Sequence, residues 1–158
     1  MENLWQKKFL DSTPTEKTPA SILKEQGKHL SEQTKNQLVV TVKPYTVNIE
    51  IYKSLFDQIF DVQTKDAKIN KKLGLPNMAL VHDFIVSAPT LGNYQFVLLK
   101  IQHSMSDSYP LNVENCINPN NQKVRNEKEY EEALKNVFTD AMTIKVINTL
   151  LSQILVEA

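Results

Sequence analysis

The two histidines His82 and His103 are the residues whose types and spacing best suit chemistry in this chain. Both fall within the apolar stretch 78–104. This stretch has the composition of a β-hairpin, in which the two imidazoles would be diagonal neighbours on one face, with Cβ atoms about 7 Å apart. Imidazoles at that spacing can share a metal ion, and zinc would take a further ligand from Cys116 or Glu114. A metal-assisted hydrolase built on the two histidines is therefore one hypothesis. The competing interpretation, and the commoner role, is two rim histidines that bond to backbone or water.

Other catalytic motifs are absent from the sequence. The glycines Gly27, Gly74 and Gly92 are too far apart for a phosphate-binding loop, and no G-x-S-x-G, H-E-x-x-H or C-x-x-C occurs. Asp83 follows His82 but would point to the opposite face of a strand, so it cannot orient that imidazole. The sequence therefore predicts no cofactor and favours a protein that is not an enzyme.

The hairpin that would position the histidines has a definite predicted register. Residues facing each other across a four-residue turn have numbers that sum to about 183, as they do in Phe84 with Leu99, Val86 with Val97, and Asp83 with Lys100. One face then becomes the core side. The other face mixes polar groups with the apolar residues Val81, Ile85, Phe96 and Leu98, which we predict to contact a partner or another part of the chain.

Periodicity in the rest of the chain predicts the remaining elements. They are a helix capped by Thr18, strands at 38–43, 47–52 and 109–117, a helix at 127–138 and a second one starting at 139 or 140. We expect an α+β fold: an antiparallel sheet of four or five strands with an N-terminal helix and two C-terminal helices packed on one face.

Three local features refine this expectation. Pro44 is expected to end the first strand, because proline cannot donate to a central ladder. The polar segment 118–126 is expected to be a turn-rich connector. Gly27 lies on the apolar stripe of the first helix, where it would let that helix approach its neighbour closely. The predicted core is Leu30, Val40, Ile49, Phe84, Val86, Val97, Leu99, Leu134, Phe138, Ile147 and Leu151.

The N-terminal end is apolar and precedes a polar stretch that contains two prolines. We expect residues 1–17 to form a tethered segment and linker, followed by a single α+β domain at 18–158. Trp5 and Phe9 in this segment would either dock on the same chain or bind another subunit.

A lysine-rich loop is predicted at 64–72, with its charge on Lys65, Lys68, Lys71 and Lys72. It is expected to be a solvated insertion, and weak nucleic-acid binding is the alternative. The whole chain carries 18 basic and 18 acidic residues, and Arg125 is its one arginine. Because phosphate and guanine recognition uses the guanidinium fork, nucleic acid is a disfavoured partner.

The cysteine content, hydropathy and N-terminal pattern predict the compartment, and the apolar surface predicts the kind of partner. The lone Cys116 cannot form an internal disulfide, no apolar run reaches the roughly 20 residues of a membrane span, and the first ten residues lack a secretory pattern. We expect a soluble cytoplasmic protein. Apolar surface without a catalytic set predicts a protein-interaction module that self-associates as a homodimer or binds a protein partner.

Overall fold

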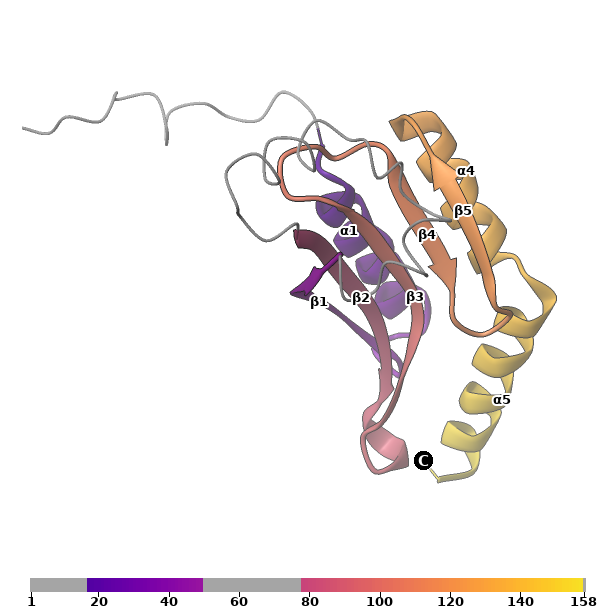
Figure 1. The fold of residues 1–158 in the computed structure, drawn as a ribbon. Helices are drawn as coiled ribbons and strands as arrows, with labels where there is room; N and C mark the ends of the chain where they lie inside the picture. Colours follow the sequence, from indigo (N-terminus) through magenta and orange to yellow (C-terminus); the bar gives the residue numbers. More distant parts are fainter. Residues whose placement is uncertain (1–16, 50–77, 158) are drawn as a thin grey trace, which may run out of the picture.

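The computed structural model describes residues 17–49 and 78–157. Five antiparallel strands form one sheet in chain order, and three helices pack on one of its faces (Figure 1), which confirms the predicted α+β fold. The elements are α1 Pro19–Gln33, β1 Val39–Asn48, β2 Met78–Ala88, the 3-10 turn η1 Pro89–Leu91, β3 Tyr94–Ser104, β4 Leu111–Asn115, β5 Asn120–Val124, α4 Glu127–Phe138 and α5 Ala141–Glu157.

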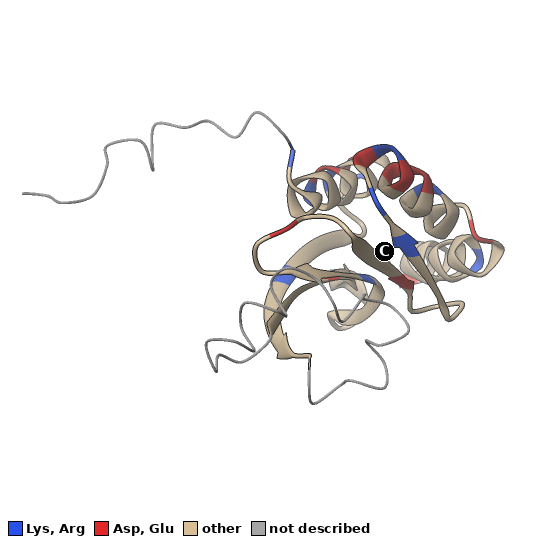
Figure 2. Cartoon of the chain, turned by 45° about the horizontal axis from the view of Figure 1, so that its top comes forward, with Lys and Arg blue, Asp and Glu red and all other residues tan. Residues whose placement is uncertain are grey.

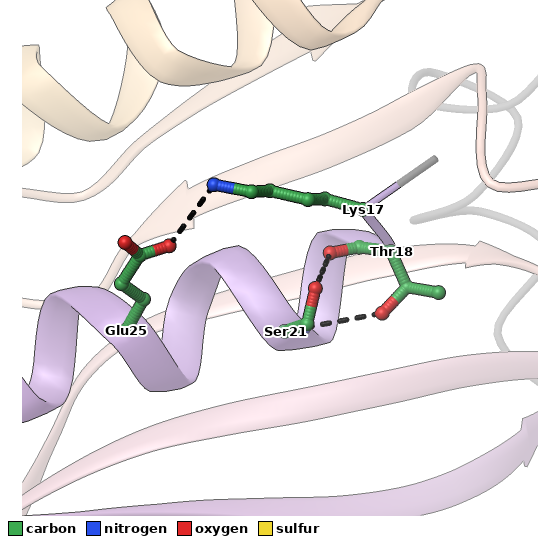
Figure 3. Close-up of polar contacts among 4 residues, drawn as sticks. All are labelled: Lys17, Thr18, Ser21 and Glu25. Carbon is green, nitrogen blue, oxygen red and sulfur yellow. Dashed lines mark hydrogen bonds and ion pairs between the residues drawn. The ribbon is translucent and has the colours of Figure 1, made fainter. Parts of the chain in front are cut away.

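The start of α1 is fixed by local hydrogen bonds (Figure 3). Thr18 Oγ1 accepts from the Ser21 amide at 3.2 Å, and Ser21 Oγ donates to the Thr18 carbonyl oxygen at 2.8 Å. Pro19 follows at the first helical position, where no amide proton is needed. Lys17 and Glu25 form an exposed ion pair at 3.4 Å, which contributes little to stability because water screens it. The predicted cap is therefore present.

Gly27 brings α1 close to β1, as its place on the apolar stripe predicted. A Cβ atom at residue 27 would lie 2.6 Å from Val40 Cγ1 and 2.9 Å from Val40 Cβ. Carbon atoms do not pack at these distances. The missing side chain is therefore what allows this contact between the helix and the sheet.

β1 is one continuous strand, where two strands were predicted. Pro44 lies in its middle and is paired with His82. Within the described sheet β1 pairs with β2 alone, so proline occupies an edge position where a missing donor is tolerated. The prediction that Pro44 ends a strand was wrong. Val47 packs with Ile49 and Ala79 in a small second cluster, separate from the main core.

The predicted hairpin register is correct near the open end, where Phe84 pairs with Leu99 and Asp83 with Lys100. Between Phe84 and the next residue of β2 the register shifts by one, which marks a β-bulge. The bulge leaves β3 with one extra residue towards the hairpin tip. The predicted pairing, in which facing residues have numbers that sum to about 183, is therefore off by one residue in that half of the hairpin.

The bulge changes which side chains of β3 face the core. Val86 pairs with Phe96, and Val97 pairs with Ile85 on the other face. Leu98 is 1% exposed and belongs to the core, and Phe96 packs against it. The predictions that Val97 is a core residue and that Phe96 and Leu98 lie on the partner face were therefore wrong.

A fifth strand replaces the connector predicted at 118–126. Asn115 Oδ1 accepts hydrogen bonds from the amides of Ile117 (3.0 Å) and Asn118 (3.1 Å), which stabilises the turn between β4 and β5. β5 has the sequence NNQKV, and Val124 is its one buried residue. Its composition resembles a loop, and pairing with β4 makes it a strand.

The two C-terminal helices complete the core. Asn126 caps α4 by accepting from the Glu129 amide at 2.8 Å, while the Glu129 carboxylate accepts from the Arg125 amide at 2.7 Å. Tyr130 is fully buried and donates a 2.8 Å hydrogen bond to the Pro19 carbonyl oxygen, which ties α4 to the start of α1. Other predicted core residues pack as expected, with Leu30, Val40, Phe138, Ile147 and Leu151 partly buried against the cluster.

Charge is distributed unevenly between these two helices. α4 carries a series of Lys and Glu residues along its outer surface (Figure 2), whereas α5 contains Lys145 as its single base and Glu157 as its single acid. None of the described helices is long and apolar enough to cross a membrane.

Candidate functional site

A groove of about 900 Å³ lies between α5 and the tip of the β2–β3 hairpin. We call it the α5 groove. The hairpin tip contributes Leu91 and Tyr94, and the apolar contributions of α5 include Met142, Val146 and Val156. Figure 1 shows α5 running down to the level of the hairpin tip, where the C-terminus lies.

α5 forms one wall of the groove, and apolar residues occupy most of its circumference. It starts after Asp140, whose carboxylate accepts from the Met142 amide at 2.8 Å. The buried residues of the helix are Thr143, Leu150 and Ile154. A core-facing helix of this composition usually buries a wider stripe. The groove side of α5 therefore leaves apolar side chains in contact with water.

The hairpin tip forms the other wall. Pro89 begins the turn η1, and Gly92 and Asn93 then adopt positive φ angles of 65° and 59°, which reverse the chain. Tyr94 follows directly, and its ring centroid lies 6.1 Å from that of Phe96. Phe96 packs against the core, so the exposed Tyr94 ring rests on a fixed base.

The two histidines lie side by side on the helix-covered face of the sheet. Their ring centroids are 6.1 Å apart with an interplanar angle of 23°, and both side chains are buried. His103 Nδ1 donates to the Ser104 carbonyl oxygen at 2.7 Å. Burial, followed by the charges of His103 and Lys24, lowers the pKa of His82, so this imidazole favours its neutral form.

The further zinc ligands proposed from the sequence are not brought to the histidines. Glu114 pairs with Lys100, whose side chain lies on the opposite face of the sheet from His82 and His103. In the part of the chain that the structure describes, no group of three or more His, Cys, Asp or Glu residues is placed to hold a metal ion. Cys116 is a free thiol whose pKa is raised to about 11, first by burial and then by Glu114.

A polar network occupies the sheet face opposite the helices. Lys100 Nζ donates to Tyr45 Oη at 3.3 Å, and Tyr45 Oη donates to Asp83 Oδ1 at 3.1 Å. Burial raises the pKa of Tyr45. Burial alone would lower the pKa of Lys100, but the hydrogen bond to Tyr45 and the charge of Asp83 raise it overall. At neutral pH the phenol therefore keeps its proton and the lysine its charge.

The residues predicted to bind a partner do not form one surface. Val81 is buried and Ile85 half-buried, and both lie on the sheet face that carries the polar network. Phe96 and Leu98 belong to the core side, as described above. Trp5 and Phe9, together with the lysine loop 64–72, lie outside the described residues.

Two features of these sites were not predicted from the sequence. The Asp83–Lys100 pair was predicted, but Tyr45 was not, because Pro44 was interpreted as the end of a strand. Leu91 was assigned to the hairpin turn and Tyr94 to the start of the strand that follows it, and neither was predicted to line a groove. The apolar girth of the C-terminal helix was the available signal for the groove.

Comparison with known proteins adds no assignment: no protein-family model, curated protein or solved structure matches this chain.

Proposed function

We propose that this protein is a non-enzymatic interaction module that binds an apolar protein segment in the α5 groove. The observation that carries the proposal is the exposure of the apolar side chains around the groove: Tyr94 is 52%, Met142 47% and Val156 81% exposed. Each Å² of apolar surface removed from water contributes about 25 cal/mol. Covering these side chains would therefore stabilise a complex.

The shape of the groove suits a helical or extended segment. From Met142 to Val156 the wall formed by α5 is about 21 Å long, at 1.5 Å per residue. Peptide-binding proteins commonly hold an amphipathic helix in a groove of this kind, with apolar anchors facing the walls. Lys145 and Glu157 line the same groove and offer charged contacts to the bound segment.

The titration behaviour of the polar groups supports a role without catalysis. A general base works best when its pKa lies near the working pH. The shifts at Tyr45, Lys100 and Cys116 all move these groups away from neutrality. We place the protein in the cytoplasm, which the unpaired Cys116 supports.

Site-specific photocrosslinking tests the proposal. A benzoylphenylalanine introduced at Gln153, which lines the groove, is irradiated in cells of the native host. The matched control carries it at the adjacent Ser152, which is also exposed but does not line the groove. We expect a protein adduct from position 153 and much less from position 152.

The mass of the adduct identifies the kind of partner. An adduct of twice the chain mass indicates a second copy, and any other mass indicates a different protein. Equal labelling from both positions, or no protein adduct from position 153, would contradict the proposal.

A further inference from the structure

We infer that the occupant of the α5 groove is the α5 helix of a second copy, paired antiparallel about a two-fold axis at Thr149. This inference rests on the proposed function and names its partner. A two-fold interface uses the same patch on both chains, so the patch must be complementary to itself. The groove side of α5 has this property.

The groove side of α5 is close to a palindrome in its chemistry. The residues Met142, Lys145, Thr149, Gln153 and Val156 all line the groove. Met142 and Val156 stand seven residues on either side of Thr149, and Lys145 and Gln153 stand four residues on either side. In an antiparallel pair centred on Thr149, Met142 therefore meets Val156 of the second copy at both ends, and the long polar side chains meet between them.

The centre of the palindrome permits close approach. Thr149 is small and exposed, and its hydroxyl donates to the Lys145 carbonyl oxygen at 2.7 Å within its own helix. Helices pack with their axes about 8 to 10 Å apart, with the distance set by the side chains at the contact. A threonine on each side of the axis suits the short end of that range.

The charges of α5 also fit an antiparallel partner better than they fit their own helix. α5 has no acidic residue in its first turn and no basic residue in its last, and it ends at Glu157. The negative end of the helix dipole disfavours an acid there. In the antiparallel pair, Glu157 lies one turn beyond Gln153, within reach of Lys145 of the second copy. Two symmetric Lys145–Glu157 pairs result.

The hairpin tip would flank the incoming helix. Leu91 and Tyr94 face α5 across the groove, and Tyr94 is 52% exposed. Because η1 packs against α5, the helix of the second copy would lie along the open side of the groove, in contact with both α5 and Tyr94, so that each copy covers the groove of the other. Aromatic side chains at such positions commonly anchor interfaces.

Charge reversal with sedimentation equilibrium of the full chain tests the inference. Lys145→Glu and Glu157→Lys each turn two attractive pairs into two repulsive ones, and we expect the dimer dissociation constant to rise about 30-fold, equivalent to about 2 kcal/mol. The double variant restores both pairs with reversed sign and should return to within about threefold of the natural chain. Lys128→Glu, on the exposed side of α4, is the matched control and should change the constant less than about twofold.

Three results would overturn the inference: a natural chain that is monomeric at all concentrations, a double variant as weak as the single ones, or an equal effect of Lys128→Glu. The proposed function is judged separately by the photocrosslink from position 153. A monomeric chain that crosslinks to a different protein removes the inference and leaves the proposed function standing.

Discussion

Replacing Gly27 with alanine tests how closely α1 packs on the sheet. Helix propensity alone predicts that Gly27→Ala stabilises the protein by about 1 kcal/mol. The packing predicts the opposite, because the new Cβ would lie 2.6 Å from Val40 Cγ1 and 2.9 Å from Val40 Cβ. The Cγ1 contact could be relieved by a rotation of the valine, but valine has few alternative rotamers. The Cβ contact can be relieved only if the backbone of α1 or β1 moves.

The expected net effect is a loss of stability. Overpacking of this kind costs about 1 to 3 kcal/mol, and a contact with a Cβ atom belongs at the upper end. After the gain in helix propensity, the free energy of unfolding should fall by about 2 kcal/mol, which lowers the melting temperature of a chain this size by roughly 4 to 8 °C. Urea unfolding followed by far-ultraviolet circular dichroism measures the difference.

A double-mutant cycle with Val40→Ala separates packing from propensity. Val40→Ala removes the closest clashing atom, so it should cost at least about 1 kcal/mol less in the Gly27→Ala background than in the natural chain. Lys28→Ala, at an exposed position of the same helix, is the control and should change stability by less than about 0.5 kcal/mol. A stabilised Gly27→Ala variant with additive effects would refute the close approach of α1 to β1.

Three further outcomes follow from buried polar groups. Tyr130→Phe removes the 2.8 Å hydrogen bond to the buried Pro19 carbonyl oxygen and should lower the free energy of unfolding by about 1 to 3 kcal/mol, measured by urea unfolding. The pKa of His82 is lowered from 6.5, so its contribution to stability is present above that pH and is lost as the pH falls through the folded-state value. The natural chain should therefore lose more stability than His82→Gln between about pH 7.5 and pH 5.5, and equal losses would contradict this. Because the pKa of Cys116 is raised to about 11 from 9.0, its thiolate fraction at pH 8 is about a hundredfold smaller. A more basic thiolate is also more nucleophilic, so the folded chain should react with Ellman's reagent about tenfold more slowly than the chain unfolded in urea.

Much of the architecture could be predicted from the sequence because local signals agreed with the tertiary fold. Thr18 with Pro19 starts α1, Asn126 starts α4, and the alternation within 78–104 builds the central hairpin. Where local chemistry and pairing disagreed, the sequence misled. Pro44 is tolerated because β1 pairs on one side within the described sheet.

The candidate site was harder to predict for a physical reason. A β-bulge has no composition of its own, so one extra residue in β3 moved Leu98 into the core without a local signal. The groove depends on how far α5 stands from the hairpin tip, which is a tertiary property. Sequence periodicity indicates which side chains are apolar, and it does not indicate which of them the fold leaves uncovered.

The most direct test of self-association through the α5 groove is a sedimentation comparison of two neighbouring residues. Val156 lines the groove and is 81% exposed, while Leu155 does not line it and is 77% exposed. Glutamate at either position should have a similar, small effect on folding. A difference in mass between the two variants therefore reports on the groove side of α5. We predict that the natural chain and Leu155→Glu sediment at twice the 18.1 kDa of one chain, and that Val156→Glu sediments as a monomer. Dissociation by Leu155→Glu instead, or identical masses for all three chains, would contradict the account.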